Sequence, residues 1–312
     1  MSRLTHYWQF VRPFTLLVPS TGMFAGALMA LGMAPAWQSE WSSTTAVIAL
    51  RIAAGALMAS ALNGFSNGIN QIYDIEVDRI NKPRRPLPSG SMALPEAWAV
   101  SLAFLAAALG LGWWVNWQCL LLAALAALLT TVYSVPPLRT KGRGLWANIT
   151  IAIPRGTLLI VAGWSSVKDI FASPEPWIIG GVFGLFFLGA ATTKDFADIE
   201  GDRQGGCLTL PVVYGIRRAT LLIAPFFVLP FLGLLAALAL GFLSGNPYIL
   251  GALGVLLSLW GAYIAATLVK SAEKAFAPQS GMAFENHPSW KHMYLLTMVA
   301  QIGFASAYLA PV

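Results

Sequence analysis

The sequence predicts an all-α protein, a polytopic membrane bundle of nine transmembrane helices. Charged residues make up only 10% of the 312 residues, and hydrophobic residues make up 57%. The mean hydropathy is +0.68, whereas a soluble domain carries roughly 25% charged residues. Apolar runs of the roughly 17 to 25 residues that a helix needs to cross a bilayer recur along the chain. They leave no room for a separate soluble domain.

Each predicted span is an apolar run bounded by charged, proline-containing or glycine-containing segments. The nine spans are expected at about residues 14–33, 45–66, 95–115, 118–134, 146–164, 177–193, 219–242, 248–269 and 291–310. Only Asn116 and Trp117 separate the third span from the fourth, so these two helices should form a tight hairpin. We expect one domain over residues 1–312.

The distribution of Lys and Arg sets the expected orientation. With the N-terminus in the cytoplasm, sixteen of the nineteen Lys and Arg residues fall on the cytoplasmic side, as the positive-inside rule requires. We therefore expect an integral protein of the plasma (inner) membrane with its C-terminus on the opposite side. The net charge of +6 is explained by this topology, and we expect no nucleic-acid partner.

An acidic run follows the second predicted span. Asn70, Asp74 and Asp78 recur every four residues, so on a helix they share one face. Oxygen ligands on one face suit a hard cation such as Mg²⁺. A basic, proline-broken run at 81–90 comes directly after them.

A second acidic run follows the sixth predicted span. Asp195, Asp198 and Asp202 again share one helical face. With Glu76 and Glu200, the two runs at 67–79 and 194–203 hold seven of the thirteen acidic residues. Both runs follow even-numbered spans, so both should emerge on the cytoplasmic side and form one site. The repeated pattern indicates two related halves, about 1–145 and 146–312.

Carboxylates gathered at the mouth of an apolar bundle repel one another unless cations neutralise them. A carboxylate cluster with nearby bases is how enzymes hold Mg²⁺ that bridges substrate phosphates. Bases that could receive phosphate oxygens are Arg79, Lys82, Arg84, Arg85, Lys194 and Arg203. A third run, 133–141, ends the fourth span with two prolines and brings Arg139 and Lys141 to the same mouth.

A phosphate-binding mouth on an apolar interior predicts an amphiphilic substrate with a charged head and a hydrocarbon tail. A polyprenyl diphosphate has this form. Loss of an allylic diphosphate leaves a carbocation, so catalysis needs cations on the leaving group and exclusion of water. The predicted reaction is prenyl transfer. Tyr133 borders the mouth, and its aromatic face could stabilise a cation.

Four motifs resemble the UbiA superfamily of intramembrane prenyltransferases. They are Asn70-x-x-x-Asp74-x-x-x-Asp78, the Asn-Lys-Pro-Arg-Arg-Pro run at 81–90, Tyr-Ser-x-Pro-Pro-x-Arg-x-Lys at 133–141, and Asp195-x-x-Asp198-x-x-x-Asp202. The resemblance implies a helical bundle around a central cavity, a lateral opening to lipid and two Mg²⁺ ions held with the diphosphate.

The resemblance also implies roles for individual residues. The expected metal ligands are Asn70, Asp74, Asp78, Asp195, Asp198 and Asp202. The expected catalytic residues are Asp74, Asp78, Asp198, Asp202 and Tyr133. The resemblance places Asn67 close to the metal set and implies that Arg139 and Lys141 bind phosphate. Together with the bases named above, the expected diphosphate-binding residues are Asn67, Asn70, Arg79, Lys82, Arg84, Arg139, Lys141, Lys194 and Arg203.

The longer phrases around these motifs are similar to the branch that contains homogentisate prenyltransferase, chlorophyll synthase and geranylgeranylglyceryl phosphate prenyltransferase. This branch implies geranylgeranyl or phytyl diphosphate as the donor and an aromatic or lipid alcohol as the acceptor. The motifs belong to the diphosphate half of the reaction, so they do not assign the acceptor.

Two other function classes remain open from the residues alone. A phospholipid-type phosphotransferase also uses helical aspartates and a divalent metal, and a cation transporter also gathers carboxylates. Arg155 follows Pro154 inside the fifth predicted span, either as a pocket residue or in a structural ion pair. The loop at 270–290 is either a lid over the site or an ordinary cytoplasmic loop.

Overall fold

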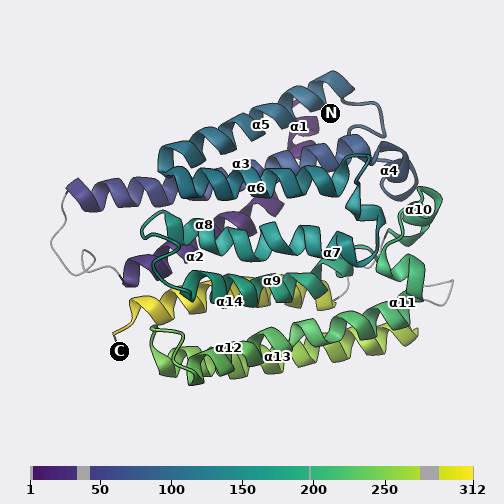
Figure 1. The fold of residues 1–312 in the computed structure, drawn as a ribbon. Helices are drawn as coiled ribbons and strands as arrows, with labels where there is room; N and C mark the ends of the chain where they lie inside the picture. The colour runs from purple at the N-terminus through teal and green to yellow at the C-terminus, as the bar shows by residue number, and fades with distance from the viewer. Residues whose placement is uncertain (1–2, 34–42, 197, 275–287, 312) are drawn as a thin grey trace.

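The computed structural model describes residues 3–33, 43–196, 198–274 and 288–311. Within these ranges the chain is helical, and its only β-type pairing is an isolated bridge between Arg143 and Leu208. Figure 1 shows the long helices lying side by side along one common direction, with α5 at one edge and α12 and α13 at the other. The predicted all-α fold is confirmed.

The elements follow the predicted order, with several spans divided into two or three pieces. Their bounds are α1 Arg3–Val11, η1 Pro13–Leu16, α2 Leu17–Gly32, α3 Ser43–Tyr73, α4 Ile75–Asn81, α5 Leu94–Val115, α6 Trp117–Ser134, η3 Thr140–Gly142, α7 Leu145–Ala152, η4 Ile153–Leu158, α8 Leu159–Ser165, α9 Glu175–Ala190, η5 Ala191–Lys194, α10 Ile199–Gln204, α11 Leu210–Ile223, η6 Ala224–Phe227, α12 Leu229–Ala239, α13 Pro247–Lys274 and α14 Pro288–Leu309.

Eight segments of the described chain are long and apolar enough to cross a membrane. They are Arg3–Gly32, Thr45–Tyr73, Leu94–Val115, Trp117–Ser134, Leu145–Ser165, Glu175–Lys194, Leu210–Ala239 and Pro247–Ala272. The predicted count of nine is therefore not confirmed. The predicted ninth span coincides with α14, whose interior carries polar side chains such as Gln301, and α14 packs against α2 and α13.

The predicted hairpin between the third and fourth spans has a clear local cause. Pro95 stands in the first turn of α5, where a missing backbone N–H is tolerated. Asn116 ends α5 in an extended conformation, and its Oδ1 accepts a hydrogen bond from the Cys119 N–H at 2.8 Å. The same residue therefore stops one helix and caps the next.

Glycines allow the closest helix crossing near the N-terminus. A Cβ on Gly163 of α8 would collide with the carbonyl oxygen of Met23 and would lie 2.9 Å from the Cα of Gly26 in α2. A Cβ on Gly26 would in turn collide with the carbonyl oxygen of Ile160. The two backbones therefore touch, as is typical of small-residue contacts between membrane helices.

The Gly163→Ala substitution should force α2 and α8 apart and lower the melting temperature of the protein in detergent. The cost is expected to be about 1–3 kcal/mol, since the added methyl group overpacks a rigid backbone contact. Gly110→Ala is the matched control, because none of the described residues outside the local helix backbone has an atom within 4 Å of a Cβ at that position. Equal melting temperatures for the two variants would contradict the proposed contact.

Candidate active site

The two acidic runs meet at one end of the bundle. The short helices α4 and α10 lie together at the end where the chain begins, away from the C-terminus (Figure 1). Asn81 at the end of α4 donates from Nδ2 to the carbonyl oxygen of Asp198 at 3.0 Å, and its Oδ1 accepts from the Gly201 N–H at 3.0 Å. Gly201 is required here, because a Cβ would collide with the Asn81 side chain. The predicted meeting of the two runs is therefore present in the fold.

Both acidic runs have the same local geometry. Asp74 precedes α4 with φ −104° and ψ 13°, and Asp198 precedes α10 with φ −105° and ψ 5°. The Asp78 N–H donates to the Asp74 carbonyl at 2.7 Å, and the Asp202 N–H donates to the Asp198 carbonyl at 2.8 Å. The sequence pattern predicted one helical face for each run, but the structure interrupts the helix at Asp74 and at Asp198. The four-residue spacing still brings the paired carboxylates together.

Asp74 is the most fully compensated carboxylate of the site. Lys141 Nζ donates to its Oδ2 at 2.6 Å, and Arg139 Nη2 donates to its Oδ1 at 3.1 Å. Burial by itself would raise the pKa of Asp74, but these two cations lower it below its ordinary value. Burial likewise opposes the charge on Lys141, yet Asp74 and the other acidic groups raise the pKa of that amine. Both groups are charged at neutral pH.

The basic run at 81–90 supplies a cation to each acidic run. Lys82 Nζ lies 2.5 and 2.6 Å from the two carboxylate oxygens of Asp198, and Arg85 Nη1 lies 2.6 Å from Asp78 Oδ2. Burial still raises the pKa of Asp78 despite Arg85. Lys82 therefore connects the first half of the chain to the second, across 116 residues of sequence.

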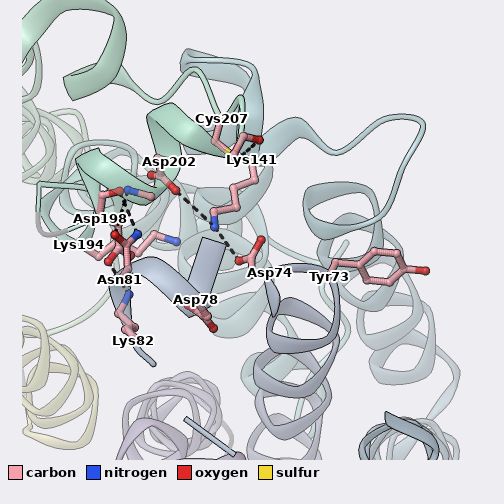
Figure 2. Close-up of polar contacts among 12 residues, drawn as sticks. Tyr73, Asp74, Asp78, Asn81, Lys82, Lys141, Lys194, Asp198, Asp202 and Cys207 are labelled. Carbon is pink, nitrogen blue, oxygen red and sulfur yellow. Dashed lines mark hydrogen bonds and ion pairs between the residues drawn. The ribbon is translucent and has the colours of Figure 1, made fainter. Parts of the chain in front are cut away.

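Asp195 and Asp202 are buried with weaker compensation. Lys141 Nζ lies 3.7 Å from Asp202 Oδ1, and among the described residues neither oxygen of this fully buried carboxylate has a hydrogen-bond partner (Figure 2). Burial raises the pKa of Asp202 to about 6 and that of Asp195 to about 7. The orphaned oxygens of Asp202 and the all-oxygen donor set fit a hard divalent cation.

Protein ligands alone do not complete a metal site. In the described part of the chain, no three His, Cys, Asp or Glu side chains are grouped closely enough to hold a metal ion. Bases separate the carboxylates instead, as Figure 2 shows for Lys141 between Asp74 and Asp202. Mg²⁺ commonly takes one or two carboxylates together with substrate phosphate oxygens and water, so a shared site with phosphate matches this arrangement.

A cavity of about 480 Å³ extends from the acidic mouth into the bundle. This volume is in the range of binding sites for small molecules. The charged mouth residues of the lining are Arg12, Asp74, Asp78, Lys82, Arg85, Lys141, Lys194, Asp195 and Asp198. The apolar part of the lining includes Met58, Leu62, Leu122, Ala126, Leu158, Leu159, Phe187 and Met293.

The buried Tyr133 and the half-buried Lys194 form a pair in the cavity wall. Lys194 Nζ donates to the Tyr133 hydroxyl at 2.7 Å and lies 4.9 Å from the centre of its ring. Both residues were predicted at the site, and both line the cavity. The pair places a positive charge and an aromatic face at the boundary between the polar mouth and the apolar interior. Tyr73, by contrast, points away from the acidic cluster (Figure 2).

The structure brings together some of the predicted phosphate-binding residues and separates others. Asn70 lines the cavity, as does Asn67, although the Asn67 amide donates to the Val11 carbonyl at 3.0 Å and to Thr15 Oγ1 at 2.8 Å. Arg139 is held behind Asp74 and is not part of the lining. The remaining predicted bases lie at the surface outside the lining: Arg79, Arg84 and Arg203.

Arg79 has a specific reason to lie outside the cavity. Its guanidinium pairs with Glu76 at 2.7 Å on an exposed face of α4, where 58% of the Arg79 side chain is exposed. Of the adjacent Arg84 and Arg85 in the basic run, Arg85 points inward and pairs with Asp78. The choice between Arg84 and Arg85 depends on the turn at Pro83 and Pro86, which spacing alone does not determine.

The sequence reasoning missed the connecting role of Asn81. Its amide is satisfied entirely by the opposite acidic run. The available signal was an amide residue at a helix end together with a glycine, Gly201, inside the second run. That combination is typical of a close approach between two backbones.

Removing the Asn81 amide should loosen the contact between the two acidic runs. The Asn81→Ala variant is expected to lose about 1–3 kcal/mol of stability, because it removes two hydrogen bonds and leaves partly buried backbone groups unpaired. Gln204→Ala is the matched control, since the Gln204 amide donates to the exposed Glu200 of the same helix at 2.6 Å. Unfolding of both variants in detergent measures the difference. A stability loss for Asn81→Ala no larger than for the control would contradict a connecting role.

Comparison with known proteins agrees with this geometry. Residues 20–287 match the model of the UbiA prenyltransferase family. Homogentisate phytyltransferase of Synechocystis is 30% identical over 255 residues, which cover 77% of this chain and 80% of that protein. Digeranylgeranylglyceryl phosphate synthase of Methanopyrus kandleri is 30% identical over 251 residues, 80% of each chain. Probable homogentisate phytyltransferase 2 of rice is 31% identical over 77% of this chain, but the match spans only 63% of the rice protein.

Solved structures share the fold over nearly the whole chain. A structure of digeranylgeranylglyceryl phosphate synthase has a TM-score of 0.67 at 24% identity and covers 99% of both chains. A UbiA homologue from Archaeoglobus fulgidus bound to GPP and Mg²⁺ has a TM-score of 0.69 at 18% identity and covers 97% of this chain and 99% of that one. At these identities the likeness establishes the fold alone. The family match over most of the chain establishes more: this protein is a member of the UbiA prenyltransferase family.

Proposed function

We propose that this protein transfers a polyprenyl group from an allylic polyprenyl diphosphate to an aromatic or lipid-alcohol acceptor within the membrane, with release of diphosphate. The observation that carries the proposal is the cavity, which joins a mouth of alternating carboxylates and bases to an apolar interior. This shape matches a substrate with an anionic head and a hydrocarbon tail. The names of the relatives add phytyl and geranylgeranyl groups as the donors we expect.

The residues that would hold Mg²⁺ are the carboxylates of the two runs. Asp74 and Asp78 in the first run are equivalent to Asp198 and Asp202 in the second. Asp74, Asp78 and Asp198 line the cavity together with Asp195 and Asn70, whereas Asp202 is buried outside the lining, 3.7 Å from Lys141. When bound, two Mg²⁺ ions would neutralise the diphosphate and assist its departure. Lys82, Arg85 and Lys141 neutralise these carboxylates in the structure, so we expect the same bases to move to phosphate oxygens when the donor binds.

The chain's own groups account for the remaining steps. The C–O bond of the allylic diphosphate breaks, and its electron pair leaves with the phosphate oxygen. Lys141 and Lys194 both line the cavity, where they would stabilise the departing diphosphate, and the Tyr133 ring beside Lys194 would lie near the allylic carbon. The acceptor then forms the new bond and loses a proton, while the apolar lining excludes water that would otherwise capture the cation.

The same arrangement supports the proposed membrane orientation. The acidic mouth and the N-terminal helix lie at one end of the bundle, and the C-terminus lies at the other (Figure 1). The basic residues of the runs at 81–90 and 133–141 also lie at the mouth end. We therefore propose a cytoplasmic mouth and N-terminus in an integral protein of the plasma membrane. The equivalent bends at Asp74 and Asp198 support two related halves within one domain.

Replacing an aspartate in either run should strongly reduce prenyl transfer. Asp74→Asn and Asp198→Asn each remove a charge from the proposed metal and diphosphate site, and each should lower the transfer rate by at least about 100-fold. Glu76→Gln is the matched control, because Glu76 lies on the exposed face of α4 and pairs with Arg79. Transfer of radiolabelled geranylgeranyl groups from the diphosphate, with Mg²⁺ and after chelation, gives the rates. Full activity in either aspartate variant would contradict the assignment.

Three assays on the purified protein separate the classes of function. Geranylgeranyl and phytyl diphosphate are incubated with homogentisate, chlorophyllide, 4-hydroxybenzoate and geranylgeranylglyceryl phosphate, and we expect a prenylated product with at least one of them. A phosphotransferase would instead consume a nucleotide-linked donor. A cation transporter would give flux in proteoliposomes without any diphosphate, although its ions should bind near the bilayer midplane and not at helix ends.

A further inference from the structure

Arg155 is a cation inside the predicted membrane-spanning region. It lies in η4, within the span Leu145–Ser165, and its half-buried side chain lines the cavity. No carboxylate of the described chain forms an ion pair with it. A charged side chain at this depth is costly and is usually paired or functional. The structural ion pair considered from sequence is therefore absent among the described residues.

The backbone around Arg155 directs this residue to the cavity. Residues Ile153–Leu158 form a π-helical turn, which often occurs at functional sites. A Cβ on the adjacent Gly156 would lie 2.5 Å from the Cα of Gly184, so this side of the turn is in contact with the α9 backbone. Pro154, Arg155 and Leu158 lie on the cavity wall instead. Local packing therefore fixes which side chains face the cavity.

The depth of Arg155 separates it from the diphosphate mouth. It follows Leu145, the first residue of α7, by ten positions, which corresponds to about 15 Å along a helix. Helical side chains tilt toward the N-terminus of their helix, which here is toward the mouth. The charge of Arg155 is close enough to interact with that of Lys194. The guanidinium therefore lies between the polar mouth and the apolar interior.

The charges of the cavity lining leave Arg155 without compensation. The described lining contains six basic and four acidic residues. Asp74, Asp78 and Asp198 are already paired with other cations, and Asp195 lies beside Lys194. The donor would bring its diphosphate together with Mg²⁺, so it would add little net negative charge. An anion at Arg155 must therefore come from another ligand of the cavity.

We propose that Arg155 binds an anionic group, a carboxylate or a phosphate, of the prenyl acceptor and so selects acceptors that carry one. This inference rests on the proposed prenyl transfer and assigns a specificity residue to its second substrate. A planar guanidinium binds either oxyanion through two parallel hydrogen bonds. Arg155 would then hold the anionic group while the nucleophilic atom of the acceptor faces the allylic carbon near Tyr133.

Matched pairs of acceptors test this role by steady-state kinetics. Homogentisate is compared with methylhydroquinone, which lacks only the carboxylate, and geranylgeranylglyceryl phosphate is compared with geranylgeranylglycerol. Arg155→Gln should raise the KM for the preferred anionic acceptor by about 10- to 100-fold, the loss expected for a charge-assisted hydrogen bond. It should change the KM for the donor and for the neutral acceptor by less than about twofold. Arg155→Lys should give partial rescue. The acceptor pair that responds tells a carboxylate from a phosphate.

Arg51→Gln is the matched control, because Arg51 is an exposed arginine within another membrane span and outside the cavity lining. It should leave all four KM values unchanged. An equal loss with neutral and anionic acceptors in Arg155→Gln, or a raised KM for the donor, would overturn the proposal. Melting temperatures of the variants report whether they fold.

A binding assay without turnover separates failure of this inference from failure of the proposed function. Homogentisate or geranylgeranylglyceryl phosphate alone should raise the melting temperature of the unmodified protein but not that of Arg155→Gln. This result would support an anion site at Arg155 even if no prenyl product formed, in which case the proposed function would fail by itself. Equal stabilisation of both proteins, or of neither, would overturn the anion site.

Discussion

Charge compensation among buried carboxylates at one end of the bundle is the constraint on which the rest of the structure depends. Asp74, Asp78 and Asp198 are each within 2.6 Å of a basic nitrogen, and the bases come from two separate segments of the chain, 81–90 and 133–141. Breaking a buried pair by removing one partner costs about 3–5 kcal/mol, so these pairs hold the loops at 81–90 and 133–141 over the mouth. The same pairs can exchange for phosphate and metal, because every base that neutralises a carboxylate is also a phosphate donor group. The same residues therefore stabilise the mouth when no ligand is bound and bind the donor when it arrives.

The position of the site was predictable because it depends on spacing and topology. Four-residue spacing puts Asn70, Asp74 and Asp78 on one face. Asp198 comes to the same end of the bundle because both acidic runs follow even-numbered predicted spans. Which base would pair with which acid was not predictable, since Lys82 and Asp198 are 116 residues apart and meet only through the contact of α4 with α10. The exposed positions of Arg79, Arg84 and Arg203 follow from local turns and from the nearby Glu76, which charge counting does not resolve.

The fold class was set by composition, but the boundaries and number of the spans were not. Apolar length correctly indicated a helical membrane bundle, whereas α14 carries enough polar residues that its status as a ninth span is not confirmed. Residue spacing could not predict the bends at Asp74 and Asp198, because a bent helix and a straight helix share the same four-residue pattern. The contact between Asn81 and the backbone near Gly201 could not be predicted for a related reason. It joins the two halves of the chain, and residue spacing within one run does not indicate which residues of the other run lie nearby. The proposed lid at 270–290 lies largely outside the described residues.

A double-mutant cycle tests most directly the central claim that the two acidic runs form one site. The affinity of a non-hydrolysable geranylgeranyl thiodiphosphate is measured with Mn²⁺ in the unmodified protein, in Asp78→Asn, in Asp202→Asn and in the double variant. Two runs that hold one metal and diphosphate cluster predict strong non-additivity, so that the second substitution adds little to the loss caused by the first. Groups that share no partner give additive losses within about 0.5 kcal/mol. Additive losses, or unchanged affinity in either single variant, would contradict the account.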